Sequence, residues 1–108
     1  LRLSAAPSGG STDSDSDQVT EGEQLAVTDV IFQNPTGAVG TVSLLRNDEV
    51  LLQSELANFR DFDLHFVAPF VFTGPDEIVL EVDCRTPGTG GADCPVAATI
   101  VGFIDEVG

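Results

Sequence analysis

One short segment, DFDLHF, gathers the side chains of this chain that could carry out acid–base chemistry. Asp61, Asp63 and His65 occupy alternate positions, and Arg60 comes directly before them. Alternate residues of a strand lie roughly 7 Å apart on one face, so a histidine beside carboxylates could act there as a general base or help to hold a metal ion. The intervening residues are all apolar, which is the pattern of a strand with one solvated face. We therefore expect a polar strand face here rather than an active site.

The rest of the chain offers little that would complete an active site. His65 is the single histidine, so a metal shell could include no second imidazole. A serine hydrolase of the common α/β type would carry a GxSxG turn, and the sequence has none. We accordingly predict a protein that is not an enzyme and that uses no cofactor.

The acidic segment DSDSD is a candidate for calcium binding. Asp13, Asp15 and Asp17 match the first three ligand positions of an EF-hand loop. The match then fails, because Gln18 stands where the loop needs glycine and Gln24 stands where it needs a bidentate glutamate. An EF-hand is thereby excluded. Weak calcium binding by the three aspartates remains beside the simpler interpretation of a solvated acidic segment.

The two cysteines predict a disulfide. Cys84 and Cys94 enclose the loop RTPGTGGAD, which has no histidine or further cysteine to complete a metal shell. Closing a loop of about 11 residues stabilises a fold by roughly 2 to 3 kcal/mol on a chain-entropy argument. Persistent disulfides belong to oxidising compartments, so we expect the protein outside the cytosol. The alternative is a pair of unpaired thiols in a reducing compartment.

The charge balance limits the possible partners. Eighteen acidic residues stand against four arginines and no lysine, for a formal net charge of −14. Such a field repels phosphate backbones and anionic lipids, so we expect no nucleic acid partner. No apolar run approaches the roughly 18 residues that cross a bilayer, so we expect no membrane insertion. Cations and basic surfaces are better partners, although high acidity is also typical of solubility or of a salt-rich habitat.

Short apolar segments separated by turn residues predict an all-β fold. Most of these segments alternate between apolar and polar residues or are rich in β-branched and aromatic residues. Their spacing, with a turn signal about every eight to twelve residues, is typical of sandwiches. We predict an antiparallel β-sandwich, jelly-roll-like, with about seven strands and one disulfide. The expected strands are 25–33, 39–45, 50–56, 61–66, 70–72, 77–84 and 96–104.

Two local patterns refine this prediction. The tetrapeptide RNDE between two apolar segments predicts a hairpin in which Leu45 faces Val50 and Arg46 pairs with Glu49 across the strands. Pro69 cannot donate a ladder hydrogen bond, so its strand is expected at a sheet edge, at a bulge or at a bend.

The two ends of the chain carry the remaining predictions. Residues 1–24 are small, polar and acidic, which indicates a linker or arm ahead of a sandwich domain at 25–108. The last strand, 96–104, is apolar on both faces, as a central strand or one covered by another subunit would be. The interface candidates at the two ends are Leu1, Leu3, Val101 and Phe103.

The stretch from residue 25 to 72, followed by EIVLEVDC and a second cysteine, resembles small secreted β-sandwich domains of actinobacterial type. NFRDFDLHF and the paired cysteines are the most specific parts of the likeness, which covers about residues 25–104. The resemblance implies export, a disulfide and no catalysis. The strand pattern is also similar in architecture to decoration and spike domains of virus heads.

These observations favour a non-catalytic structural or interaction module at a cell or virion surface. In this hypothesis the domain packs against copies of itself, as a homo-oligomer, or against other structural proteins. The alternative is a monomeric ligand-binding ectodomain on a tether, with or without calcium. Both hypotheses place the protein outside the cell or on a virion.

Overall fold

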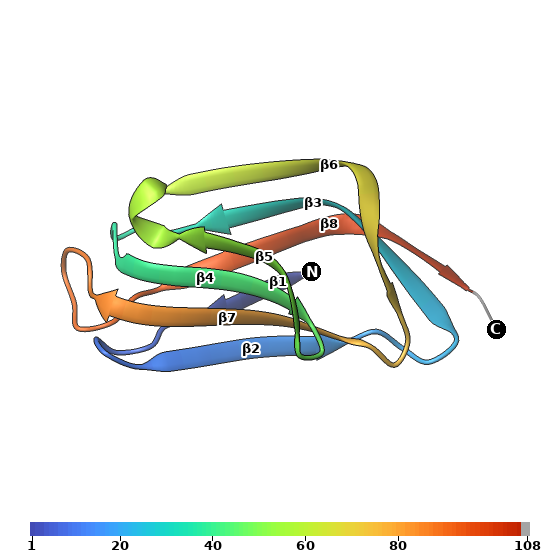
Figure 1. Ribbon diagram of the computed structural model, residues 1–108, viewed down its shortest axis with the longest axis horizontal. Helices are drawn as coiled ribbons and strands as arrows, with labels where there is room; N and C mark the ends of the chain where they lie inside the picture. The colour runs from blue at the N-terminus through green and yellow to red at the C-terminus, as the bar shows by residue number, and fades with distance from the viewer. Residues whose placement is uncertain (107–108) are drawn as a thin grey trace.

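The chain folds into a sandwich of two antiparallel sheets (Figure 1). The computed structural model describes residues 1–106. Its elements are β1 (Arg2–Ala5), β2 (Thr12–Gln18), β3 (Glu23–Gln33), β4 (Val39–Arg46), β5 (Glu49–Glu55), the short 3-10 turn η1 (Leu56–Asn58), β6 (Asp61–Thr73), β7 (Glu77–Thr86) and β8 (Val96–Glu106). The predicted all-β sandwich is therefore confirmed, with eight strands.

The strand order explains the apolar last strand and the position of the proline. One sheet has the order β1-β8-β3-β6 and the other β2-β7-β4-β5. Over Val96–Thr99 β8 lies between β1 and β3, as a central strand would, whereas among the described residues Val101–Glu106 pair with β3 alone and are exposed. β6, which contains Pro69, is an edge strand, so the proline removes no hydrogen bond that a further neighbour would need.

The core lies between the two sheets and is built from the alternation seen in the sequence. On β7, Ile78, Leu80 and Val82 are at most 1% exposed, while the residues between them point outward or toward the rim. Phe32 of β3 and Phe72 of β6 are also buried and add the largest side chains. Burial of this apolar surface is the main stabilising term of the fold.

Residues 1–24 differ from the expected linker, because they contribute strands to both sheets. Leu3 and Ala5 of β1 pack into the core and are 3% and 7% exposed. β2 pairs along its whole length with β7. An edge strand needs only one backbone ladder and little apolar surface, so a polar segment such as DSDSD can form one. Arg2–Ala5 and Thr12–Gln18 of this segment are therefore part of the sandwich itself.

The disulfide fastens this N-terminal segment to the sandwich. Cys84 and Cys94 are bonded, with their Cα atoms 5.7 Å apart, and both are fully buried. The N–H of Cys84 donates to the carbonyl of Ser11 at 2.9 Å, and the N–H of Cys94 donates to that of Pro7 at 2.8 Å. The predicted disulfide is confirmed, and its two half-cystines hold both sides of the loop between β1 and β2.

The predicted hairpin is formed by β4 and β5. Leu45 lies opposite Val50, and Arg46 donates to the Glu49 carboxylate at 2.9 Å. Asn47, in the turn, has a φ of 55°, a left-handed conformation that asparagine adopts more readily than most residues.

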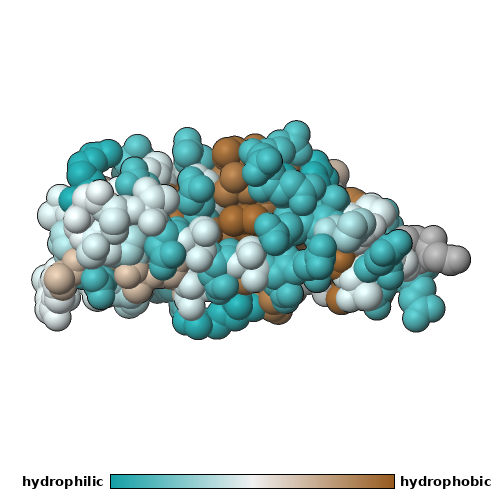
Figure 2. Space-filling model, turned by 90° about the horizontal axis from the view of Figure 1, so that it is seen from below, coloured by the Kyte–Doolittle hydropathy of each residue, from teal (hydrophilic) through white to brown (hydrophobic). Residues whose placement is uncertain are grey.

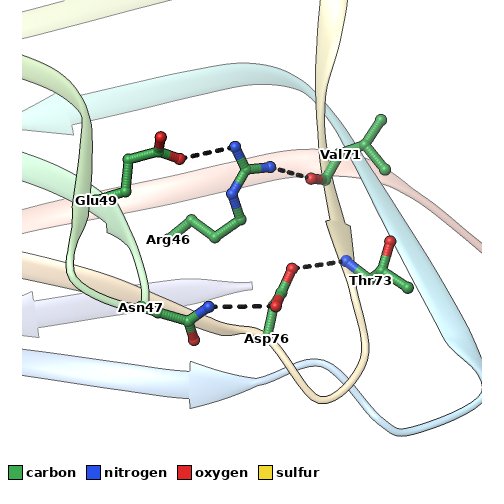
Figure 3. A network of polar contacts seen from close by, with 6 residues as sticks. All are labelled: Arg46, Asn47, Glu49, Val71, Thr73 and Asp76. Carbon is green, nitrogen blue, oxygen red and sulfur yellow. Dashed lines mark hydrogen bonds and ion pairs between the residues drawn. The ribbon is translucent and has the colours of Figure 1, made fainter.

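A polar network ties this hairpin to the far end of β6 (Figure 3). Arg46 donates from Nη1 to the carbonyl of Val71 at 2.6 Å. Asn47 donates to one oxygen of Asp76 at 3.2 Å, and the other oxygen accepts the N–H of Thr73 at 3.0 Å. The network holds the hairpin against the last part of β6, where that strand has bent away from its first half (Figure 1).

The bend of β6 coincides with an irregularity in β3. The register of β3 shifts between Val27 and Asp29 against both neighbouring strands. Gly102 of β8 lies opposite Val27, and a Cβ there would collide with the backbone carbonyl of Ala26. Gly102 therefore marks a close approach of β3 to β8 next to a bulge.

Candidate functional site

The polar face of β6 brings its histidine to a partner on the neighbouring strand. His65 lies opposite Asp29 of β3, and His65 Nδ1 is 2.7 Å from Asp29 Oδ1. The second oxygen of Asp29 accepts a hydrogen bond from Thr28 at 2.9 Å. These hydrogen bonds, first that of His65 and then that of Thr28, lower the pKa of the Asp29 carboxyl below its ordinary value.

The other polar residues of this segment do not join the pair. Arg60 turns away and donates to the carbonyl of Pro35 at 3.0 Å. Asp61 and Asp63 are exposed along the strand. Asp29 was not identified as a partner from the sequence, because the register between β3 and β6 brings it to His65. Within residues 1–106, Asp29 is the single side-chain partner of His65, so the geometry is that of an orienting hydrogen bond at a surface.

The three aspartates of β2 lie along one rim of the sandwich. Asp13, Asp15 and Asp17 pair with inward-facing residues of β7 and share their side of the sheet. Asp15 Oδ2 accepts the N–H of Ser4 on β1 at 3.0 Å, so it satisfies an edge donor of the opposite sheet. Their positions along a strand place alternate carboxylates roughly 7 Å apart. No group of three or more potential metal ligands occurs within the described part of the chain.

An apolar groove of about 570 Å³ opens beside these aspartates, at the C-terminal end of β8. Ile78 and Ile100 of the core line it, together with the edges of β2, β3 and β8. The further lining residues are Leu1, Asp17, Gln18, Val19, Thr20, Glu23, Leu25, Gly102, Phe103 and Ile104. The groove is thus a continuation of the core that the sheets leave uncovered.

Large apolar side chains are exposed around this groove. Phe103 is 56% exposed, Ile104 59% and Leu1 50%, with Val101 at 43% on the same strand. Three of the four interface candidates from the sequence therefore lie at the surface. Leu3 does not, because it packs in the core of its own domain, and Ile104 takes its place in this cluster.

The exposed apolar side chains of β8 lie on two different faces of the strand. Ile104 lies opposite Leu25, and both line the groove. Phe103 lies opposite Ala26, which in turn lies opposite Val71 of β6. An apolar row therefore crosses the outer face of the sheet next to the groove. On the face seen in Figure 2, a largely hydrophilic surface, the main apolar area lies near the middle of the long axis and smaller apolar areas lie toward the right-hand end.

The rim of the groove is acidic. Asp17 and Glu23 line it, and Asp105 and Glu106 follow Ile104 at the end of β8. Glu23 lies opposite Glu106, so carboxylates face each other where β3 begins and β8 ends. None of the four arginines lines the groove. An apolar surface with this rim suits a ligand that is both apolar and positively charged.

Comparisons with known proteins give no family. No family model matches the chain, and no curated protein sequence matches it. The resemblance to secreted actinobacterial-type domains therefore stays a prediction. Within residues 1–106 the structure contains no helix with the length and apolar character needed to cross a membrane.

Solved structures that share features of this fold are distant. PliG of Aeromonas hydrophila, a periplasmic inhibitor of g-type lysozyme, has 10% identity and a TM-score of 0.49, covering 94% of this chain and 85% of that one. The NLP core of Drosophila has 11% identity and a TM-score of 0.41, covering 97% and 98%. A chain of infectious bursal disease virus, Gx strain, has 15% identity and a TM-score of 0.36, covering 95% and 28%. Likenesses this distant assign no function to the chain.

Proposed function

We propose that this protein is a non-catalytic interaction module, exported or displayed on a cell or virion surface, that binds another protein through the apolar groove beside β8. The exposure of Phe103 and Ile104 around this groove, in a chain of net charge −14, is the observation that carries the proposal. Contiguous apolar surface rimmed by polar residues marks interaction sites, and it costs solubility unless a partner covers it.

The remaining polar groups support a non-catalytic role. His65 is exposed and is oriented by Asp29, but it lies on the outer face of the sheet and does not line the groove beside β8. On β2, Asp15 accepts the N–H groups of Ser4 and Ser16, and Asp17 accepts that of Gln18. His65, Asp15 and Asp17 thus have structural partners.

The disulfide supports export. Cys84 and Cys94 are buried and close the loop that holds the N-terminal segment. A disulfide in this position persists in oxidising surroundings and is reduced in the cytosol. A surface location also suits a partner of opposite charge that meets the domain outside the cell.

The test replaces the two exposed side chains with serine and asks whether they serve the fold or a partner. Phe103→Ser together with Ile104→Ser should change the free energy of unfolding by less than about 1 kcal/mol, because these side chains are largely exposed already. Val50→Ser is the matched control, since Val50 is 53% exposed on β5 and does not line the groove. The free energy of unfolding of the wild type, the double serine variant and Val50→Ser is measured by urea denaturation.

The same variants then test binding. Native mass is measured by light scattering after gel filtration, at low and high salt, to detect packing against copies. Peptides selected on the wild-type domain serve as probes of a heterologous partner. Binding should be lost in the serine variant and kept in Val50→Ser. A loss of 2 kcal/mol or more in stability on replacing Phe103 and Ile104 would show that these residues serve the fold, and the proposal would be withdrawn.

A further inference from the structure

One side of the sandwich leaves its core less covered than the other. On the side formed by β1 and β2, Leu3 and Ala5 are buried, and the N–H of Ser4 donates to Asp15 at 3.0 Å and so connects the two sheets. β6 and β5 are the outer strands of the two sheets on the opposite side (Figure 1). Among the described residues, the partly buried apolar side chains that pack on the core lie on β5, on β6 or between them, except for Leu25. The core is therefore partly open to solvent on the side of β5 and β6.

The first half of β6 also has a free backbone edge. The N–H of Asn34 donates to the carbonyl of Arg60 at 2.7 Å, so the backbone groups of Arg60 face β3. Because these groups alternate in direction along a strand, those of Asp61, Asp63 and His65 face away from β3. Among the described strands β6 pairs with β3 alone, so the backbone groups of these three residues meet no second strand.

Irregular backbone bounds this stretch, which we call the β6 edge (Asp61–His65). Beyond it, residues 66–69 of β6 lie opposite the single residue Thr28 of β3, so β6 leaves the regular ladder there. On its other side the stretch follows η1. An added strand can therefore pair with β6 only between η1 and the irregular segment 66–69.

The side chains of the β6 edge differ between its two faces. Phe62 and Leu64 pack on the core and remain partly exposed. Asp61 and Asp63 lie on the outer face, are exposed, and have no basic partner within residues 1–106. An added strand would therefore find apolar contacts on one face and two carboxylates in line on the other.

We propose that the β6 edge receives an extended segment of a partner protein in which apolar and basic residues alternate. The segment runs antiparallel to β6 as a further strand of the sheet, a mode of binding in which backbone hydrogen bonds give affinity and alternate side chains give specificity. Its basic side chains lie opposite Asp61 and Asp63, and its apolar side chains cover Phe62 and Leu64. No residue of β5 or β6 lines the groove beside β8, so this site goes beyond the interaction role proposed above.

The charge of the β6 edge selects this occupant over a second copy of the chain. Two copies paired antiparallel along the whole edge would bring Asp63 opposite Asp63 and would add a second net charge of −14. Charged side chains on an edge strand commonly prevent such pairing between copies. His65, which would lie opposite Asp61, already contacts Asp29 at 2.7 Å. A segment with basic residues at alternate positions instead forms two cross-strand pairs of opposite charge.

A designed peptide tests the proposal. Valine and lysine alternate in this capped peptide, and its binding to the disulfide-bonded domain is followed by amide NMR at low salt. Binding should shift the resonances of Asp61–His65 and should become about fivefold weaker when Asp61→Asn and Asp63→Asn are combined. The matched control combines Glu81→Gln with Asp83→Asn, which removes two exposed carboxylates from alternate positions of β7 and should leave the affinity unchanged. Equal weakening by both double variants would show general charge attraction and overturn the proposal.

Backbone methylation of this peptide tests strand pairing directly. The lysines opposite Asp61 and Asp63 direct their N–H groups at β6, because directly opposite residues of this kind exchange both backbone hydrogen bonds. N-methylation of the lysines should therefore weaken binding about tenfold, and N-methylation of the valines about threefold or less. Equal effects of the two methylations would overturn strand addition.

The groove variants separate this inference from the proposed function. Phe103→Ser with Ile104→Ser should leave the affinity for the designed peptide unchanged, since neither residue belongs to β6. Loss of binding in that variant would place the peptide in the groove beside β8, which would overturn this inference and support the role of the groove. If the free domain dimerises and the resonances of Asp61–His65 shift with protein concentration, the occupant is a second copy and the proposal of a basic partner segment is wrong.

Discussion

Asn34 makes a sharp test of how the loops of this sandwich are held. Its side chain is fully buried at the end of β3 and joins segments that are far apart in the chain. Its Oδ1 accepts the N–H of Ala38 at 3.0 Å, while its Nδ2 donates to the carbonyls of Ala38 and Leu56 at 3.0 Å and of Phe59 at 3.3 Å. One amide thus connects the loop before β4 with the turn after β5.

Asn34→Ala should lower the free energy of unfolding by about 2 to 4 kcal/mol. The substitution leaves the buried N–H of Ala38 and the carbonyl of Leu56 without this partner, and each unsatisfied buried group costs about 1 to 3 kcal/mol before relaxation. Asn34→Asp should cost more at neutral pH, because a buried carboxylate would face carbonyl oxygens where the amide donated. Part of that loss should be recovered as pH falls and the carboxyl becomes protonated and able to donate.

Urea denaturation followed by circular dichroism measures these changes. Asn58→Ala is the matched control, since Asn58 is exposed in η1, and it should remain within about 0.5 kcal/mol of the wild type. A change for Asn34→Ala no larger than that of the control would refute the assignment of a structural role to this amide.

Three further predictions concern the remaining parts of the fold. Replacing Cys84 and Cys94 by alanine should destabilise the domain by about 3 kcal/mol, as denaturation under non-reducing conditions would show, and no loss would contradict the role given to the loop closure. Leu3→Ala should cost about 2 to 4 kcal/mol because Leu3 is a core residue, whereas a free N-terminal linker would give no change. His65→Asn should raise the pKa of Asp29 toward its ordinary value, and carboxyl titration by NMR measures this. A carboxyl whose pKa is lowered in the folded protein stabilises the fold at pH values above its ordinary pKa, and this stabilisation is lost as the pH falls through the lowered pKa. The difference in the free energy of unfolding between His65→Asn and the wild type should therefore shrink at acidic pH. A difference that persists at acidic pH would contradict the pairing.

Local alternation predicted much of the sandwich because the pattern of side chains reports burial directly. The strand around Leu80 and the hairpin turn at Asn47 each follow from residues next to one another in the chain. Pro69 allowed an edge, a bulge or a bend, and the sheet order places its strand at an edge. The disulfide followed from composition alone, because two cysteines in a polar loop have few other uses.

The sequence failed where pairing, not burial, decides the structure. The segment of Asp13, Asp15 and Asp17 has almost no apolar residues, so it was taken for a linker. Its aspartates nevertheless alternate with the two-residue period of a strand, and β7 supplies the backbone hydrogen bonds that hold it in the sheet. Leu3 was assigned to an interface because it belongs to the segment taken for a linker or arm, and only the fold shows that it fills the core.

The candidate site depended on the same long-range information. Phe103 was evident as an apolar residue near the end of β8, but the groove is formed by residues of β2, β3 and β8 that are far apart in the sequence. Likewise Asp29 meets His65 through the register of two strands that are distant in sequence. Neither relation leaves a local signal in the sequence, since each depends on which strands become neighbours.

The most direct test of the central claim is a backbone amide NMR map of the labelled domain, alone and saturated with a selected peptide. The account predicts that resonances of Val101–Glu106 and Val19–Leu25 shift on binding, because these segments surround the groove. Shifts confined to the Asp61–His65 face would contradict it.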